Sequence, residues 1–148
     1  MRLYRLCKAL YSKLDGAGAM RYGGRWNSPG IAVVYTASSL SLAILETRVH
    51  LTRLPVDYVK LEIEIPDAAF HPHEVTAASL VPGWRTDPAY TCSVGDALLR
   101  ADPLRPIKVP SVVVDTEWNV LFSPDYAAAH ASIVSTEPID IDPRLWSV

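Results

Sequence analysis

The spacing of apolar and polar residues predicts a chain built largely from short strands. Residues 58–65 alternate strictly between apolar side chains and polar or charged ones. An alternation with a period of two, which gives one apolar and one solvent-exposed face, is typical of a strand that packs on a core with one side. Ala32–Thr36 is apolar on both faces and predicts an interior strand, and the β-branched run Val109–Val114 predicts a third. Weaker patterns indicate strands at Leu3–Leu6, Val120–Phe122 and Ile133–Ile141.

The clearest helix is predicted over Leu40–Leu51. Ser38 or Ser39 can cap it, because a serine oxygen accepts a hydrogen bond from a free backbone N–H of the first turn. A short helix at Tyr126–Ala131 is also predicted. Both predicted helices lie between predicted strands along the chain.

A further helix is predicted at Val94–Ala101, where Ser93 and Asp96 resemble a capping box. Strands interrupted by a few short helices, without regular alternation, indicate the α+β class. We therefore expect one compact α+β domain over residues 1–148, with a mixed or antiparallel central sheet.

The amino-acid composition excludes or disfavours several classes of protein. Apolar residues make up 49% and charged residues 20%, which excludes a disordered chain, and the net charge of −2 does not favour nucleic acid or anionic membranes. No apolar run approaches the roughly 18 residues of a membrane span. Cys7 and Cys92 are too few for a disulfide framework and indicate reduced thiols, and no spacing suggests a zinc site. Lys8, Lys13 and Asp15 interrupt any signal peptide, so we expect a cytoplasmic protein.

Five of the seven glycines lie in Asp15–Gly30, which reads DGAGAMRYGGRWNSPG. Glycine serves positive backbone φ angles or close approach, so the segment is either a flexible surface loop or a ligand loop. Arg25, Trp26 and Asn27 favour the ligand loop, because arginine binds phosphate with a planar fork and tryptophan offers a stacking face. The spacing matches neither GxxxxGK[ST] nor GxGxxG, so neither NTPase nor Rossmann chemistry is supported.

Glu46 lies on or beside the apolar stripe of the predicted helix Leu40–Leu51. Burying a carboxylate without a partner costs several kcal/mol, so Glu46 either pairs with a cation such as Arg48 or Arg53 or faces a cleft. The pattern alone leaves both interpretations open. His50 lies one turn further on, and we interpret it as structural.

Ser111 follows Pro110 and precedes the apolar run Val112–Val114. A small polar residue at a strand start is commonly a solvated or hydrogen-bonded hydroxyl. No Gly-x-Ser-x-Gly elbow surrounds it, so a hydrolase nucleophile is not indicated.

Four stretches together resemble the RES domain, the toxin half of bacterial RES–Xre toxin–antitoxin systems, a family named for an Arg, a Glu and a Ser. They cover most of the chain and are Tyr4-Arg5, GAGAMRYGGRWNSPG (Gly16–Gly30), VVYTASSLSLAILETRVHL (Val33–Leu51) and VPSVVVDTEWNVLFSP (Val109–Pro124). The resemblance implies a fold similar to the ADP-ribosyltransferase toxins and chemistry on NAD⁺. One departure is SPDY, at Ser123–Tyr126, where relatives often have Asn-Pro and a nearby His, which puts a role of that segment in doubt.

By motif position, the resemblance implies that Arg25, Glu46 and Ser111 are the family's Arg, Glu and Ser, and that Arg5 and Tyr35 line the NAD⁺ pocket. Cleavage of the nicotinamide–ribose bond builds positive charge on the ribose, which the Glu46 carboxylate can stabilise. Arg5 and Arg25 suit the pyrophosphate.

The remaining roles complete the expected site. Tyr35 is expected to stack on the nicotinamide or ribose, and Ser111 to donate a hydrogen bond to nicotinamide or to the acceptor. Trp26 and Asn27 are expected to shape the NAD⁺-binding loop. No metal or cofactor is expected: NAD⁺ is the substrate, and inorganic phosphate can be a co-substrate.

Three functions remain as alternatives. The main hypothesis is an NAD⁺-degrading toxin that acts by phosphorolysis or hydrolysis. A protein-directed ADP-ribosyltransferase is the second, although Ile44 stands where classical transferases often carry a further Glu, two residues before Glu46. A non-enzymatic nucleotide-binding module is the third. An RNase toxin is disfavoured because acidic residues outnumber basic ones and the basic residues form no continuous stripe that could bind RNA.

The resemblance also implies partners. We expect a cognate Xre-like helix-turn-helix antitoxin that covers the pocket entrance, with no direct contact of this chain to nucleic acid or membrane. Leu80–Trp84 either caps the core or is exposed and supports a homodimer within a larger toxin–antitoxin complex.

Overall fold

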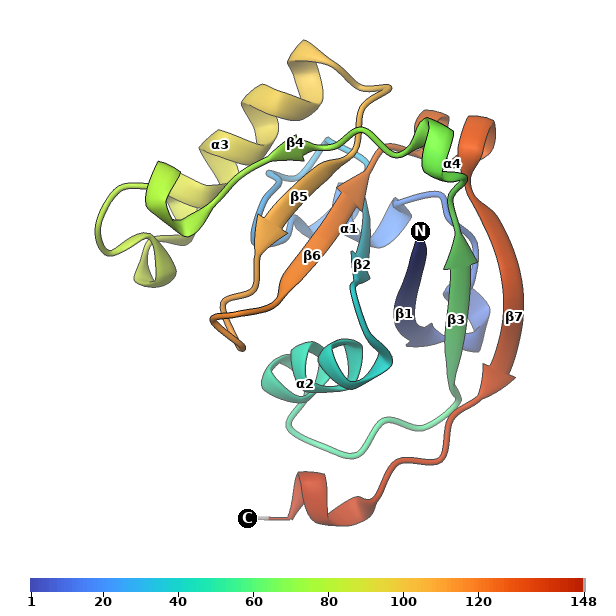
Figure 1. Ribbon diagram of the computed structural model, residues 1–148. Coiled ribbons are helices and arrows are strands. Elements are labelled where there is room, and N and C mark those ends of the chain that lie inside the picture. The colour runs from blue at the N-terminus through green and yellow to red at the C-terminus, as the bar shows by residue number, and fades with distance from the viewer. Residues whose placement is uncertain (148) are drawn as a thin grey trace.

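The computed structural model describes residues 1–147, which form a seven-stranded mixed sheet with helices packed around it (Figure 1). The strand order is β4-β5-β6-β2-β1-β3-β7, and every neighbouring pair is antiparallel except β4 and β5. This confirms the α+β class with a mixed central sheet. The strands are β1 (Arg2–Lys8), β2 (Val34–Ala37), β3 (Tyr58–Glu64), β4 (His73–Glu74), β5 (Ile107–Pro110), β6 (Trp118–Phe122) and β7 (Ser132–Pro138).

Four α-helices are found in the described residues: α1 (Ala17–Tyr22), α2 (Leu40–His50), α3 (Pro88–Ala101) and α4 (Pro124–His130). Single 3₁₀ turns lie at Ala9–Tyr11, Asp67–Ala69, Ala77–Ser79, Trp84–Thr86 and Pro143–Trp146. No helix of this part of the chain is long and apolar enough to cross a bilayer.

The strand predictions hold best where the alternation is strict. β3 occupies almost the whole of the predicted range and buries every second residue, as its period of two predicts. β2 begins at Val34 rather than Ala32. The prediction of a strand over Val109–Val114 is wrong from Ser111 onward, because β5 begins at Ile107 and ends at Pro110. Ser111 then turns the chain: its Oγ accepts hydrogen bonds from the backbone N–H groups of Val113 (3.0 Å) and Val114 (3.1 Å).

The predicted helices differ from the observed helices mainly in the residue at which they begin. α2 begins as predicted, with Ser39 Oγ accepting from Leu42 N at 3.1 Å. α3 begins at Pro88, six residues before the predicted Val94, since Asp87 caps it by accepting from Tyr90 N at 3.0 Å. The predicted capping box is therefore wrong: Ser93 and Asp96 lie inside α3.

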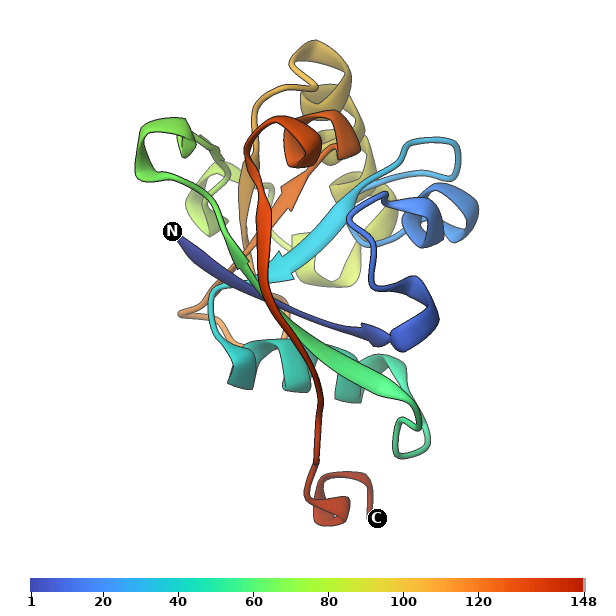
Figure 2. The same cartoon turned by 90° about the vertical axis from the view of Figure 1, so that its right-hand side faces the viewer.

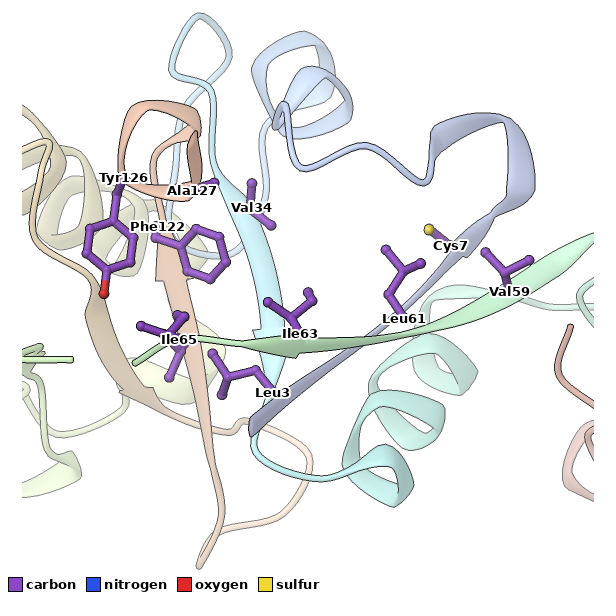
Figure 3. Packing of buried hydrophobic residues seen from close by; sticks show 11 residues of the cluster. Leu3, Cys7, Val34, Val59, Leu61, Ile63, Ile65, Phe122, Tyr126 and Ala127 are labelled. Atoms are coloured by element: carbon purple, nitrogen blue, oxygen red, sulfur yellow. The ribbon is translucent and has the colours of Figure 1, made fainter. Parts of the chain in front are cut away.

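The first hydrophobic cluster packs β1, β2, β3 and β6 beneath α4 (Figure 3). Leu61, Ile63 and Phe122 are fully buried there, and each such side chain contributes about 1.5–3 kcal/mol by leaving water. Tyr126 joins them and donates its hydroxyl to Ala69 O at 2.8 Å. Because Ser123 caps α4 and Tyr126 fills the core, the SPDY segment has a clear structural role.

The second cluster lies between β5, β6 and α3 and contains Trp26, Leu80, Trp84 and Leu99. Leu80 and Trp84 are buried and cap the core, whereas Val81 between them is 47% exposed. The segment therefore fits the core-capping interpretation at its two ends, and the homodimer interface stays a prediction. Cys7 and Cys92 are both free thiols, as predicted.

The sheet opens between its two halves. Within residues 1–147, β1 and β2 pair at a single position, Tyr4 opposite Ala37, whereas β1 and β3 pair over their whole length. Figure 2 shows β1, β3 and β7 crossing the direction of β2 rather than continuing beside it. In Figure 1, α2 lies below β2 and beside the end of β1, and it packs against both strands.

Candidate active site

A cavity of about 450 Å³ occupies the opening between β1, β2, α2 and the glycine-rich segment. Its wall includes five of the predicted site residues, which come from four separate parts of the chain: Arg5, Arg25, Trp26, Tyr35 and Glu46. The volume lies within the range of roughly 300–1,000 Å³ that is usual for small-molecule sites. Two predicted residues, Asn27 and Ser111, do not line this cavity.

The glycine-rich segment is folded and not a flexible loop. It begins with α1, and Asn27 anchors the turn after this helix by donating its side-chain amide to Ala19 O (2.9 Å) and Ile31 O (3.0 Å). Gly24 is required at its position, since a Cβ there would lie 2.7 Å from the Tyr35 hydroxyl oxygen. The segment therefore forms a rigid wall of the cavity, as the ligand-loop interpretation requires.

Tyr35 fastens this wall to β2. Its hydroxyl donates to Asn27 Oδ1 at 2.7 Å and accepts from Trp26 N at 3.0 Å. Burial raises the pKa of Tyr35 well above its usual value, so the phenol is neutral at physiological pH. With its hydroxyl engaged in this way, Tyr35 offers the cavity chiefly its ring.

Glu46 projects from α2 into the cavity, which decides between the two interpretations left open by the sequence. Its Oε1 accepts two hydrogen bonds, from Ser111 Oγ at 2.8 Å and from Asn119 Nδ2 at 2.8 Å. Within residues 1–147 no basic group lies within ion-pair distance of Glu46, and Arg48 instead donates to the carbonyl oxygen of Leu145. The carboxylate is thus held by neutral donors and keeps its charge available.

Ser111 lies behind Glu46, fully buried at the end of β5. Its Oγ accepts from two backbone N–H groups, so its own proton is directed to Glu46. The structure therefore places this serine against the carboxylate, whereas the sequence led us to expect a contact with nicotinamide or the acceptor.

Arg5 and Arg25 supply the positive side of the cavity. Arg25 Nη2 donates to the carbonyl oxygens of Trp84 (3.1 Å) and Arg85, and Arg5 Nη1 donates to Tyr35 O at 3.4 Å. The Nε atoms of both arginines are buried without a hydrogen-bond partner in the described residues. An unsatisfied buried donor costs roughly 1–3 kcal/mol, and the guanidinium groups that carry these donors are suited to an anionic ligand.

Two wall residues were not assigned to the site from the sequence. Asn119 lies in β6, opposite Val109, and both donates to Glu46 and lines the cavity. An amide in a strand of otherwise apolar residues was an available signal, since asparagine is depleted in strands. His50, interpreted as structural, also lines the cavity one turn beyond Glu46. In residues 1–147 there is no cluster of side chains able to hold a metal ion.

The sequence of this chain is similar to those of known proteins. Residues 2–142 match the model of the RES domain. A Sphingobium sp. protein named "Prs ADP-ribosylating toxin" is 43% identical over 121 residues, covering 78% of this chain and 75% of that protein. A Yersinia enterocolitica protein named "Toxin Res" is 36% identical over 156 residues, covering 98% and 99%.

The fold also matches a solved structure, the M. tuberculosis MbcT-MbcA toxin-antitoxin complex. The TM-score is 0.70 at 20% identity, and the match covers 98% of this chain and 86% of the other. This likeness shows that the two chains share a fold. With the domain match and these relatives, the chain belongs to the RES-domain family.

Proposed function

We propose that this protein is the toxin of a bacterial toxin–antitoxin system and that it consumes NAD⁺ by cleaving the nicotinamide–ribose bond. The observation that carries the proposal is the Glu46 carboxylate, fixed through one oxygen by Ser111 and Asn119 in a cavity that also holds two arginines with unused buried donors. The names of relatives that are at least 36% identical, "Toxin Res" and "Prs ADP-ribosylating toxin", support it.

The reaction requires stabilisation of positive charge. As the C–N bond to nicotinamide breaks, its electron pair leaves with nicotinamide, which becomes neutral, and the ribose acquires oxocarbenium character. Glu46 can stabilise that charge through Oε2, which accepts no hydrogen bond from the described residues. An acceptor oxygen then bonds to the ribose carbon and, when the acceptor is water, releases a proton.

The other side chains bind and orient the substrate. The guanidinium groups of Arg5 and Arg25 suit the two phosphates of NAD⁺, whose oxygens would satisfy the unpaired Nε donors. The ring of Tyr35 provides an apolar surface for the nicotinamide or ribose. Ser111 acts through Glu46: its Oγ accepts from two backbone N–H groups and donates its proton to Oε1, which orients the carboxylate.

A protein-directed ADP-ribosyltransferase is the second candidate. It keeps the same cavity and bond cleavage but uses a protein side chain as the acceptor. The name of the Sphingobium relative, at 43% identity, favours it. Ile44 favours a small acceptor instead, because it provides no acceptor-orienting carboxylate two residues before Glu46.

An antitoxin belongs to the same proposal. The matched M. tuberculosis structure is a toxin-antitoxin complex, which supports a cognate antitoxin for this chain. We propose that this antitoxin is Xre-like and covers the mouth of the cavity, so that NAD⁺ cannot enter. Adding the antitoxin would then abolish turnover without changing the folded state of the toxin.

The deciding experiment incubates the purified protein, free of antitoxin, with NAD⁺, in the presence and absence of inorganic phosphate. Nicotinamide and ADP-ribose products are separated by chromatography. A phosphate-dependent ADP-ribose-1″-phosphate product identifies a phosphorylase, and free ADP-ribose without phosphate identifies a glycohydrolase. Label transfer from NAD⁺ to a protein in a lysate, without bulk turnover, would support the transferase. No nicotinamide release under any of these conditions would refute the proposed function.

A further inference from the structure

A second cavity of about 400 Å³ lies beside the candidate active site. Its walls come from the end of α1, the segment after this helix and one face of α3. Gly23 and Gly24 line both cavities, so the backbone of the glycine-rich segment separates one from the other. Nothing in the NAD⁺ reaction uses this second space.

Asp96 places a buried negative charge in the second cavity. The residue is only 7% exposed, and its Oδ1 accepts a hydrogen bond from Ser28 N at 2.9 Å. Its Oδ2 accepts no hydrogen bond from residues 1–147, and no basic group among them lies within ion-pair distance. This oxygen is open to the cavity and has neither a hydrogen-bond donor nor a counter-ion among the described residues, so the cavity favours a positively charged occupant.

The neighbouring side chains do not supply that positive charge. The Cys92 thiol donates to Gly24 O at 3.0 Å, and burial, with a further contribution from Asp96, raises its pKa, so the thiol stays neutral. Arg21, on α1, lies over the Tyr22 ring with 5.2 Å between its Cζ and the ring centroid, and it forms no ion pair with Asp96. The negative charge of the cavity wall therefore remains unpaired.

The acceptors in the cavity wall indicate the kind of cation that fits. Ser93 Oγ donates to Tyr90 O at 2.7 Å and keeps lone pairs to accept with, as does Asp96 Oδ2. A wall that offers acceptors suits a flat group with several N–H donors. We propose that the second cavity binds a guanidinium group, with Asp96 as its ion-pair partner. The guanidinium belongs either to a small free compound or to an arginine side chain of another protein.

The test uses methylguanidinium as the probe and methylurea as its uncharged analogue, with the full chain and without NAD⁺. Backbone amide NMR shifts are followed as each probe is added. We expect shifts at Gly23, Ser28 and Asp96 with methylguanidinium, and a response to methylurea at least about tenfold weaker, because it lacks the charge. Since no NAD⁺ is present, the result does not depend on the proposed reaction.

The variant Asp96→Asn removes the negative charge of this side chain and keeps its hydrogen bond to the backbone of Ser28. Asparagine keeps an oxygen for Ser28 N, and equal unfolding temperatures of variant and parent would show that the fold survives. We expect Asp96→Asn to weaken methylguanidinium binding at least about tenfold, whereas Asp125→Asn, an exposed change on α4, leaves it unaltered. Equal binding by the Asp96→Asn variant and the parent, or equal responses to both probes, would overturn the proposal.

Two further probes distinguish the sources of the guanidinium. Agmatine represents a small free compound, and acetyl-Gly-Arg-Gly-amide represents an arginine held in a polypeptide. Tighter binding of the peptide supports a protein side chain as the occupant, and tighter binding of agmatine supports a free compound. Failure of both to displace methylguanidinium from the amides around Asp96 would count against the site.

Discussion

The acidic and basic sides of the candidate active site are built differently. Glu46 Oε1 is fixed by two short hydrogen bonds, and one of its donors, Ser111, is in turn held by two backbone N–H groups. Arg5 and Arg25 make side-chain hydrogen bonds to carbonyl oxygens only, and each keeps one buried Nε without a partner in residues 1–147. The carboxylate is thus oriented by its donors, whereas each arginine keeps one donor without an acceptor in the described residues.

For the proposed reaction, this difference predicts separate kinetic roles for the two sides. A charge held in place before the reaction stabilises the transition state without reorganisation, so Glu46 and its donors should govern kcat. Donors satisfied by the bound phosphates act equally in the ground state and the transition state, so the arginines should govern KM. Substitutions on each side can separate the two roles.

Glu46→Gln should have the largest effect. Glutamine can still accept from Ser111 and Asn119, but it lacks the charge, so we expect kcat for nicotinamide release to fall about 1,000-fold or more. The control is Glu64→Gln, an exposed change on β3. A kcat in Glu46→Gln close to that of this control would contradict the proposed role.

Arg25→Lys should raise KM for NAD⁺ about 10- to 100-fold with a smaller change in kcat, because lysine presents a point charge instead of a fork. Steady-state kinetics of nicotinamide release provide both constants. Arg100→Lys, on the exposed side of α3, serves as the matched change. An unchanged KM with a lowered kcat would reverse the assignment of the basic side.

Asn119→Ala and Ser111→Ala should each lower kcat about tenfold, since each removes one donor to Glu46 worth roughly 1–1.5 kcal/mol. Both donors act on one oxygen, so the double variant should differ from the product of the single effects. Ser111→Ala should also lower the free energy of unfolding by about 1 kcal/mol, because two half-buried N–H groups, of Val113 and Val114, lose their acceptor. Additive effects on kcat would show that the two donors do not act together.

Tyr35 belongs to the basic side, since its carbonyl oxygen accepts from Arg5 and its hydroxyl holds the segment that carries Arg25. Its substitution should produce the smallest effect, and that effect should depend on pH. Burial raises the Tyr35 pKa in the folded protein, so the unfolded chain releases this proton first as the pH rises through about 10. The stabilisation by Tyr35 is therefore complete below that pH and declines above it. Urea unfolding should show the parent losing stability more steeply than Tyr35→Phe above about pH 10, with Tyr11→Phe, an exposed change, resembling the parent. Parallel pH curves of parent and Tyr35→Phe would contradict this expectation.

Local patterns predicted the elements whose hydrogen bonds are themselves local or strictly periodic. The alternation of residues 58–65 predicted β3, and Ser39 was one of two predicted caps of α2. The end of β5 was missed because the Ser111 hydroxyl competes with the sheet for the next backbone N–H groups. The start of α3 was missed because Asp87, and not Ser93, supplies its cap.

The sequence by itself determined the family resemblance, the candidate site residues and the most regular elements, since these depend on residue identity and short spacings. Tertiary structure decided what each side chain does. Glu46, Ser111 and Asn119 are separated by up to 73 residues, and only the pairing of β5 with β6 beside α2 brings them to one oxygen. The same is true of Asp96 and Ser28, which are 68 residues apart. Hydrogen bonds of this kind depend on distances of about 3 Å between remote segments, which no local pattern encodes.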